Sequence, residues 1–403
     1  MNRPAEENRP PEAAPAQDQP EEIRGGPRSL RELIDLVSGR GFEGHFPAED
    51  AGILEHMPFP FLALVGQPEM KLALILALIN PALGGVLLIG PRGTGKTTAV
   101  RSLADLLPEI PRSFCRYGCL PEDVETGGID AVCPDCARKY AEGEPLARLA
   151  NVNLIELPLN ARIEDVVGGL DERAASNERM RIRRGILAQA DRNLLYIDEV
   201  NLLEDEIVDA VLDAAAQGRY TVRRGPLSAT YRARFTLIGS MNPEEGRLRS
   251  QIMDRFGLRV LVRGLDEAPQ RLEAYRRVQA FQVNPRRTIS EFSEETAVLK
   301  AEIQAAREAL GEVALPDPVA HQGLEIIQQM KIDSLRAEIA LFEAARAYAA
   351  ADGRREVVSA DLKEIAPLAL RGRRSAFMIE FLDHQQTEET EIQSVLERVL
   401  LSA

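Results

Sequence analysis

A glycine-rich segment, Gly90-Pro-Arg-Gly-Thr-Gly-Lys-Thr97, constrains the fold of this chain more than any other feature. It fits the pattern GxxxxGK[ST] and lies between an apolar run at Val86–Ile89 and a helical pattern at Thr97–Leu107. Glycines allow the backbone N–H groups of such a loop to face a phosphate, and the helix adds the positive end of its dipole. The segment predicts a strand–loop–helix unit that binds a nucleoside triphosphate; the alternative is a chance glycine-rich turn.

The chemistry of this loop assigns a role to each polar residue. Lys96 is expected to reach the β- and γ-phosphates, and the Thr97 hydroxyl is expected to bind the Mg²⁺ that accompanies ATP. The loop residues expected to contact the nucleotide are Gly90, Pro91, Arg92, Gly93, Thr94, Gly95, Lys96, Thr97 and Thr98.

Two acids follow a second apolar run, Leu194–Ile197. Asp198, at the carboxyl end of this predicted strand, is expected to hold Mg²⁺ through its water shell. Glu199 is expected to accept a proton from the attacking water or to orient that water. The alternative is that these are two solvated acids without a catalytic role at the end of a surface strand. The phosphate loop upstream makes this alternative less favoured.

Phosphoryl transfer also needs positive charge near the transferred group, and two arginines are candidates. Arg255 stands in Met-Asp-Arg-Phe-Gly, and Arg336 stands in Asp-Ser-Leu-Arg-Ala-Glu within a helical region. Asn242 follows a predicted strand, so its amide is expected to hold the water beside Glu199. For each arginine a surface ion pair is the alternative, and for Asn242 it is an Asn-Pro turn.

Strand and helix patterns alternate up to about residue 262. The predicted strands are Val86–Ile89, Val152–Leu157, Leu194–Ile197, Phe235–Ser240 and Leu258–Val262. This alternation predicts an α/β core with a mostly parallel sheet of five strands. Helical patterns then follow at Glu295–Leu310, Gly323–Met330, Leu335–Ala349 and Asp361–Leu370, the last with a cap near Ser359.

These patterns divide the chain into four parts. We expect a disordered tail at 1–27, an α/β core at 28–265, a helical domain at 266–372 and a C-terminal extension at 373–403. Within the core, a cysteine-containing insertion is expected at about 110–145 and a hairpin at 218–235, with Gly225-Pro226 at its turn.

Charge and hydropathy argue against two kinds of partner. A net charge of −14 and a pI of about 5.0 repel nucleic-acid phosphates, so no nucleic-acid partner is expected. Leu72–Pro91 lacks charge, but Asn80-Pro81 and Gly84-Gly85 interrupt it, so no membrane span is expected. The first residues do not show the basic and then apolar pattern of a secretory signal, so the expected location is the cytoplasm.

All four cysteines lie between residues 115 and 136, as Cys115-x₃-Cys119 and Cys133-x₂-Cys136. In a cytosolic chain, clustered thiols favour a metal or redox site over a structural disulfide. Tetrahedral thiolate coordination suits a structural Zn²⁺. A redox switch and uncoordinated thiols remain the alternatives.

The order of these motifs resembles that of an AAA+ ATPase with a C-terminal helical lid, and longer stretches resemble the ATPase subunit I of magnesium chelatase. The resemblance covers about residues 58–370. It rests on PFPFLALVGQPEMKLALILALINPALGGVLLIGPRGTGKT, LYIDEVNLLEDEIVDAVLDAAAQG, ARFTLIGSMNPEEGRLRSQIMDRFGL and DSLRAEIALFEAARA.

This resemblance implies further roles for matched positions. Asn242 matches sensor 1, and Arg336 matches the sensor 2 arginine. Arg255 matches the arginine finger that acts on ATP bound by the neighbouring subunit, and Arg249 matches a second interface arginine. Val65 and Gly66 match the segment near the adenine.

The resemblance also implies partners: a homo-oligomeric ring, expected to be a hexamer, an integrin-domain subunit and a porphyrin-binding subunit. ATP hydrolysis would then drive Mg²⁺ insertion into protoporphyrin IX, toward chlorophyll or bacteriochlorophyll. One departure is the segment Leu370-Arg-Gly-Arg-Arg, where the family has a His-Arg cluster, together with the acidic segment through Glu388, Glu389 and Glu391 that follows it. It leaves open a chelatase-like ATPase that remodels or matures another integrin-domain partner. A DNA-acting ATPase is less favoured, because the sequence has no basic stripe. A scaffold that binds nucleotide without hydrolysing it is less favoured, because Glu199 is present.

Overall fold

The computed structural model describes residues 57–115, 117–169, 182–225, 227–246 and 248–374. The chain separates into two units, Met1–His56 and Met57–Ala403, and the described residues all belong to the second. The predicted N-terminal tail and the extension beyond residue 374 therefore lie outside the described residues, as does Pro226 of the predicted hairpin turn.

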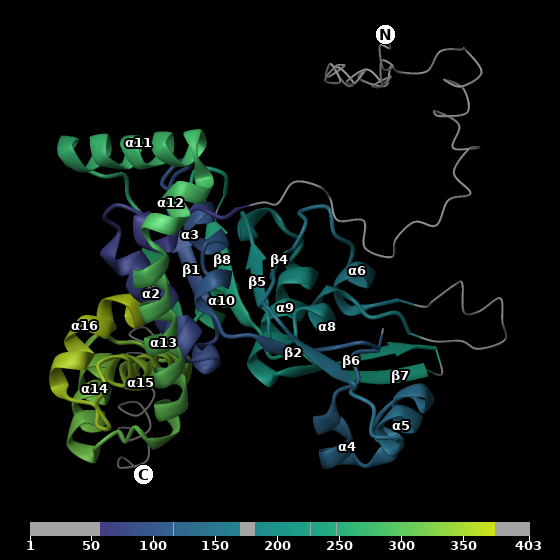
Figure 1. The fold of residues 1–403 in the computed structure, drawn as a ribbon. Coiled ribbons are helices and arrows are strands. Elements are labelled where there is room, and N and C mark those ends of the chain that lie inside the picture. Colours follow the sequence, from purple (N-terminus) through teal and green to yellow (C-terminus); the bar gives the residue numbers. More distant parts are fainter. Residues whose placement is uncertain (1–56, 116, 170–181, 226, 247, 375–403) are drawn as a thin grey trace, which may run out of the picture. The chain divides into compact units, whose positions relative to one another are not determined.

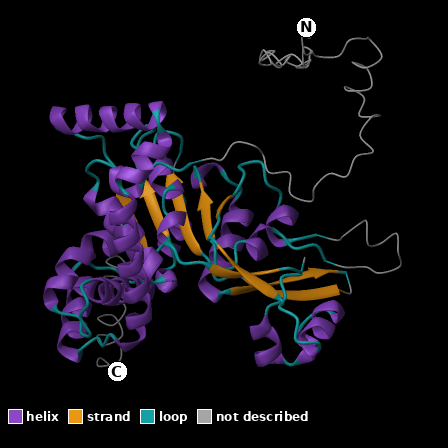
Figure 2. Ribbon diagram, viewed as in Figure 1, coloured by secondary structure: helices purple, strands orange, loops and turns teal. Residues whose placement is uncertain are grey.

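A parallel sheet of five strands carries the fold, as the alternating pattern predicts, in the order β4-β5-β8-β1-β9 (Figures 1 and 2). The strands are β1 (Val86–Ile89), β4 (Leu154–Glu156), β5 (Leu194–Ile197), β8 (Thr236–Met241) and β9 (Leu258–Leu261). Strand β1 lies between β8 and β9; it pairs with β8 through Val86 and Ile238, and with β9 through Leu88 and Val260. All carboxyl ends consequently share one edge, where the polar residues after β1, β5 and β8 meet.

Both faces of the sheet are covered by helices, which explains its almost wholly apolar strands. Leu88 of β1 joins a buried cluster that includes Leu74 of α2 (Pro68–Ile79) and Leu341 of α15 (Leu335–Ala351). Leu87, one residue earlier and on the opposite face, joins a second cluster with Val211 of α9 (Asp205–Gln217).

The segment Leu72–Pro91 is divided between α2, a 3-10 turn at Pro81–Leu83 and β1, in agreement with its Asn-Pro and Gly-Gly breaks. Among the helices that the structure describes, none combines the length and the apolar character required to cross a bilayer.

Helix α3 is shorter than its predicted range. It spans Lys96–Arg101, and a 3-10 turn at Ala104–Leu106 replaces its expected last turns. Three other helices of the core are also short: α6 (Ile163–Val167), α8 (Ile186–Gln189) and α10 (Ser250–Arg255).

Within the described residues, six α-helices follow the sheet: α11 (Ala268–Val283), α12 (Pro285–Glu291), α13 (Ser293–Ala309), α14 (Asp317–Gln329), α15 and α16 (Ser359–Leu370). The expected domain boundary at residue 265 falls between β9 and α11. The predicted cap of α16 at Ser359 is wrong, because Val358 is the N-cap and its N–H donates to the Asp361 carboxylate at 2.8 Å. The Ser359 hydroxyl instead donates to Gln322, at 2.6 Å.

Two smaller elements project from the core. The predicted hairpin consists of β6 (Arg219–Arg224) and β7 (Leu227–Arg232), paired antiparallel. The cysteine-containing insertion has its own ribbon, β2 (Ile110–Ser113) with β3 (Ala147–Ala150), and two helices, α4 (Pro121–Gly127) and α5 (Pro134–Ala141). Figure 1 shows α4 near β7, to which it is joined by an ion pair between Asp123 and Arg232.

Candidate nucleotide-binding site

The phosphate loop joins β1 to α3 at the carboxyl edge of the sheet. At Gly90 a Cβ atom would lie 2.0 Å from the Val262 carbonyl oxygen, so only glycine fits against β9 there. Gly93 and Gly95 have φ values of +78° and +85°, a left-handed conformation that favours glycine. These glycines turn the backbone so that the loop can wrap a phosphate.

Lys96 is buried within this loop, with 8% of its surface exposed. Its ammonium group donates to the carbonyl oxygens of Gly90 and Pro91, each at 2.7 Å. Burial lowers the pKa of Lys96, while the negative charges of Asp198 and Glu199 act in the opposite direction. Phosphate oxygens would offer this ammonium group stronger, charged acceptors than the two carbonyls.

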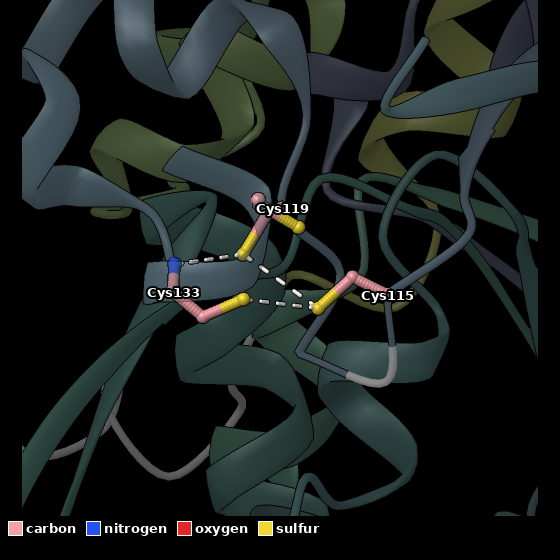
Figure 3. A group of neighbouring side chains, drawn as sticks. Cys115, Cys119 and Cys133 are labelled. Carbon is pink, nitrogen blue, oxygen red and sulfur yellow. Dashed lines mark hydrogen bonds between the residues drawn. The ribbon is translucent and has the colours of Figure 1, made fainter. Parts of the chain in front are cut away.

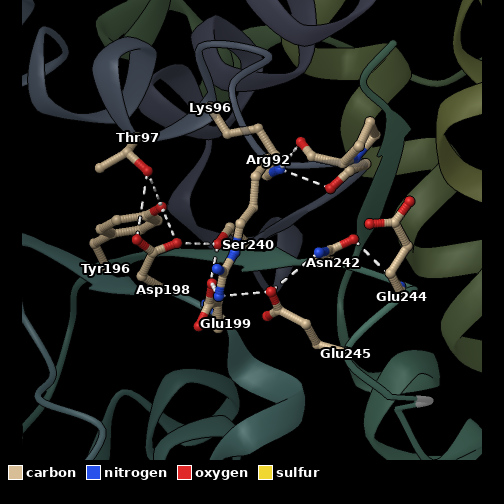
Figure 4. Close-up of polar contacts among 12 residues, drawn as sticks. Arg92, Lys96, Thr97, Tyr196, Asp198, Glu199, Ser240, Asn242, Glu244 and Glu245 are labelled. Carbon is tan, nitrogen blue, oxygen red and sulfur yellow. Dashed lines mark hydrogen bonds and ion pairs between the residues drawn. The ribbon is translucent and has the colours of Figure 1, made fainter.

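A polar cluster joins the loop to the end of β5 (Figure 4). The Thr97 hydroxyl lies 3.4 Å from Asp198 Oδ2 and 3.2 Å from the Tyr196 hydroxyl. The Tyr196 hydroxyl donates to Asp198 Oδ1 at 2.8 Å, and the Ser240 hydroxyl also donates to that oxygen. Thr97 and Asp198, the two predicted Mg²⁺ ligands, are therefore adjacent, and their oxygens are of the kind that Mg²⁺ prefers.

Sequence reasoning missed Tyr196 and Ser240. Tyr196 is almost fully buried, and this burial raises the pKa of its hydroxyl, which stays protonated and serves as a donor. A usable signal existed, because Tyr196 precedes Asp198 by two residues and side chains two apart in a strand share a face. Ser240 lies near the end of the adjacent strand β8, one residue beyond the partner of Ile197.

Glu199 adopts a left-handed backbone conformation, with φ +55°, that is uncommon for any residue except glycine. Its N–H donates to the Ser240 hydroxyl at 3.0 Å, which helps to hold this conformation. Its carboxylate lies 3.0 Å from Arg92 of the phosphate loop. The predicted base is thus held at the loop by an arginine that sequence reasoning had assigned to the nucleotide.

Asn242 reaches Glu199 only through intermediaries. Its amide nitrogen donates to Glu245 at 3.1 Å, and its oxygen accepts the Glu244 N–H at 3.2 Å. Glu245 in turn lies 2.6 Å from Arg92, which pairs with Glu199. Figure 4 shows the resulting chain of charged groups, in which Glu245 is an acid that the sequence analysis missed.

A cavity of about 540 Å³ opens beside the phosphate loop, within the size range of small-molecule sites. Val65 and the loop residues Gly93, Thr94, Gly95 and Thr98 line it, while Gly66 packs beside it against Leu265. Arg271, Ala274 and Val278 of α11 also line it, a contribution that the weak apolar pattern of α11 did not predict. This cavity suits the base and sugar of a nucleotide.

The two candidate interface arginines pair with acids of α9. Arg255 lies 2.8 Å from Asp213 and 3.1 Å from Asp209, and Arg249 pairs with Asp205. The side chain of Arg255 retains 26% of its exposure. Both arginines are therefore engaged in ion pairs with α9 of their own chain.

Arg336 belongs to a cluster around Asp254. Its guanidinium lies 3.6 Å from Asp254 Oδ2, to which the Ser334 hydroxyl also donates at 2.9 Å. The buried Arg373 lies 2.7 Å from Asp254 Oδ1, and the buried Arg259 lies 3.5 Å from it. Asp254 therefore connects the sensor 2 candidate, β9 and the segment that follows α16.

The four cysteines converge in the insertion, with all four Sγ atoms within 4.8 Å of one another. Cys115 Sγ lies 3.9 Å from Cys119 Sγ and 3.6 Å from Cys133 Sγ, and the cysteines are free thiols (Figure 3). A tetrahedral ion with metal–sulfur bonds of about 2.3 Å separates its sulfurs by about 3.8 Å. The cluster thus has the dimensions of a thiolate metal site.

Comparisons with known proteins agree with these features. Residues 324–395 match the family described as the AAA lid domain, and residues 168–260 match the MCM P-loop domain. The magnesium-chelatase 38 kDa subunit of Acidiphilium rubrum is 43% identical over 317 residues, 78% of this chain and 90% of the relative. The magnesium-chelatase subunit ChlI homolog of Methanocaldococcus jannaschii is 43% identical over 335 residues, 82% and 90% of the two chains. A solved putative ATPase from Cytophaga hutchinsonii has the same fold, with 19% identity, a TM-score of 0.50, and coverage of 83% of this chain and 91% of its own.

Proposed function

Because the chain belongs to the family of magnesium-chelatase ATPase subunits, we propose that it is the AAA+ motor that hydrolyses ATP to drive Mg²⁺ insertion into protoporphyrin IX. The product would lead toward chlorophyll or bacteriochlorophyll. The observation that carries the ATPase activity is the convergence of Lys96, Thr97, Asp198 and Glu199 at one edge of the sheet, and the 43% identity to magnesium-chelatase subunits supports the role in Mg²⁺ insertion.

Binding comes first in the proposed mechanism. The cavity beside Val65 and α11 receives the base and sugar, and the loop N–H groups and Lys96 receive the phosphates. A bound Mg²⁺, held by Thr97 and Asp198, would neutralise charge on the phosphate oxygens. Tyr196 and Ser240 fix the Asp198 carboxylate by donating hydrogen bonds to it.

Hydrolysis then requires a free Glu199 carboxylate. Water attacks the γ-phosphorus, the bond to the ADP oxygen breaks, and Glu199 accepts the proton that the water loses. Arg92, whose side chain is 71% exposed, must leave Glu199 before that carboxylate can reach the water. Glu245 supports this movement because it offers Arg92 an alternative partner at 2.6 Å.

We further propose a homo-hexameric ring in which Arg255 acts on the ATP of the neighbouring subunit and Arg249 contributes to the same interface. The acids of α9 keep Arg255 at the surface of its own chain, which supports this role. Arg336 acts as sensor 2 and Asn242 as sensor 1, coupled to Glu199 through Glu245 and Arg92.

The partners proposed for the ring are an integrin-domain subunit and a porphyrin-binding subunit. The segment after α16, which departs from the family pattern, binds within this chain: Arg371 pairs with Glu69 at 3.0 Å and Arg373 pairs with Asp254. Two of its three arginines thus have partners within this chain, which favours the chelatase role over the remodelling of another integrin-domain protein.

We also propose that the four cysteines hold a structural Zn²⁺. The apolar cluster of the insertion has Cys119, Val132, Cys136 and Leu146 as its buried members, so the thiols themselves form half of its core. So small a core rarely supports a fold without a metal or a disulfide. The reduced thiols also fit a cytoplasmic location.

Reconstitution tests the chelatase proposal. The purified chain is combined with the integrin-domain and porphyrin-binding subunits, protoporphyrin IX, Mg²⁺ and ATP, and the fluorescence of the magnesium porphyrin is followed. We expect insertion with ATP and none with ADP. The control replaces this chain with the relative from Acidiphilium rubrum. Insertion with the control but not with this chain would overturn the proposal.

A further inference from the structure

The β6–β7 hairpin needs support from outside itself. It is a two-stranded ribbon, separate from the main sheet, and such a ribbon is only marginally stable alone. Within it, Tyr220 and Tyr231 pack across the strands with ring centroids 5.7 Å apart, and Thr221 and Thr230 share a hydrogen bond of 2.9 Å. These local pairs stabilise the ribbon, and Tyr220 also packs against the apolar cluster on one face of the sheet, but the charged end of β7 needs further contacts.

Helix α4 of the cysteine insertion supplies an external contact. Arg232, at the end of β7, lies 2.6 Å from Asp123 and 3.8 Å from Glu122, both in the first turn of α4. Two further polar contacts of the hairpin are longer, from Arg224 to the Gly168 carbonyl and from Tyr231 to the Ile182 carbonyl, each at 3.4 Å. The acids of α4 are therefore the closest charged anchors of the hairpin.

One of these two acids, Glu122, also reaches the segment before the strand that leads to the catalytic residues. Glu122 also pairs with Arg192, which immediately precedes Asn193 and strand β5. Only 18% of the Arg192 side chain is exposed, and its backbone N–H donates to the Arg234 carbonyl just after β7. One turn of α4 thus connects the hairpin to the segment that leads to Asp198 and Glu199.

The position of α4 depends in turn on the cysteine cluster. Cys119 precedes the first residue of α4 by two positions, and its carbonyl accepts a hydrogen bond from Ser113 at 2.6 Å. The Cys133 N–H points to Cys119 Sγ at 3.4 Å, and the Tyr117 N–H points to Cys115 Sγ at 3.2 Å. Apart from its ion pairs with Arg192 and Arg232, α4 is held by the small apolar core of the insertion, of which Cys119 and Cys136 are buried members.

From this geometry we propose that a thiophilic divalent cation bound by the four cysteines braces the β6–β7 hairpin through Glu122 and Asp123 of α4. This inference rests on the metal site proposed above, and it adds an effect of the bound metal on the β6–β7 hairpin. Metal binding orients the first turn of α4, and this turn holds Arg232 of the hairpin and Arg192 before β5. The cation is thus a structural element of the hairpin as well as of the insertion.

Hydrogen exchange of the full-length chain, followed by mass spectrometry of the hairpin peptides, tests the brace. Metal content is measured first by elemental analysis, with one Zn²⁺ per chain expected. A zinc-selective chelator, used with Mg²⁺ present, should make exchange in β6 and β7 roughly 3- to 10-fold faster, because the lost contacts are partly exposed ion pairs. Added Zn²⁺ should restore slow exchange, and peptides from α15 should not change.

The double variant Glu122→Gln/Asp123→Asn separates the brace from the metal. It keeps the cysteines, and the asparagine side chain that replaces Asp123 retains an oxygen to accept the Leu120 N–H, which Asp123 accepts at 2.7 Å. We expect bound Zn²⁺ but the fast hairpin exchange of the chelated protein. The control is Glu125→Gln, at an exposed position of the same helix, which should behave as wild type.

The outcomes distinguish the two proposals. A chain purified without metal that binds no added Zn²⁺ would overturn the metal site and the brace with it. Bound Zn²⁺ whose removal leaves hairpin exchange unchanged would overturn the brace alone. The same conclusion would follow if the double variant exchanged as slowly as wild type. None of these results affects the ATPase assignment.

Discussion

Replacing Asp254 by asparagine should destabilise the protein, because this carboxylate neutralises buried positive charge. The side chain of Arg373 is fully buried and that of Arg259 is 1% exposed, and both approach Asp254. Burial lowers the pKa of Arg259 to about 10, with the charge of Arg373 acting in the same direction. Asparagine keeps the shape of the side chain but removes the charge that offsets this repulsion.

The expected loss follows from the environment of the two arginines. Removing one partner of a buried ion pair costs about 3–5 kcal/mol. Arg373 would keep carbonyl acceptors on Ala369, Phe256 and Gly257, at 2.7 to 3.0 Å, so we expect the lower end of that range. A loss of about 3 kcal/mol should lower the melting temperature by roughly 5 °C or more.

The pH dependence provides an independent check. Burial acts to raise the pKa of Asp254, but the hydrogen bond from Ser334 and the charge of Arg373 outweigh it, and the pKa is lowered. A lowered folded-state pKa contributes stability above the unfolded value, about 3.9, and this contribution is lost as pH falls through the folded value. The difference between wild type and variant should therefore be full at pH 7 and shrink below about pH 4.

Thermal unfolding by circular dichroism measures both effects, with Asp333→Asn as the control because Asp333 is an exposed acid in the same region. The control should melt within about 1 °C of wild type, since exposed substitutions usually cost less than about 0.5 kcal/mol. If the Asp254→Asn variant had the same melting temperature as the control at pH 7, the reasoning about the buried arginines would be refuted.

Three further predictions concern the site. Arg92→Gln should raise basal phosphate release roughly 2- to 5-fold, because it frees Glu199 from a surface ion pair, and a lower rate would contradict that restraint. Lys96→Ala should weaken ATP binding roughly 10- to 100-fold in a fluorescent-nucleotide titration, since charged hydrogen bonds to phosphate are lost; unchanged affinity would contradict its role. Arg255→Ala should lower turnover roughly 10³-fold while retaining nucleotide binding, and mixing it with Lys96→Ala should recover activity if the arginine acts across subunits. Mixed inactive variants that stay inactive would count against action in trans.

The sheet was predictable because its strands have a strong and simple signal. Val86–Ile89 and Leu194–Ile197 have the predicted bounds. Strands that are buried on both faces contain almost only apolar residues, so the ends of the apolar run mark the ends of the strand. Helix α11 was not predicted, because its residues have no apolar stripe and none of them is buried. The interior of the cysteine insertion was not predicted either, since its core is too small to impose a periodic pattern.

The site was predictable where one residue type performs the chemistry at a fixed spacing, as for Lys96, Thr97, Asp198 and Glu199. It was not predictable where a role depends on contacts between distant segments. Arg92 reaches Glu199 across 107 positions of the sequence. No local pattern could show that the arginine holds the base rather than the nucleotide.

The most direct test of the central claim is steady-state phosphate release by Glu199→Gln at saturating ATP and Mg²⁺, paired with a nucleotide-binding titration. Glutamine keeps the shape of Glu199 but cannot accept the proton of the attacking water. The account predicts wild-type affinity for ATP and turnover lower by roughly 10²- to 10⁴-fold. Turnover at the wild-type rate would contradict it, because the chain would then hydrolyse ATP without the base on which the site is built.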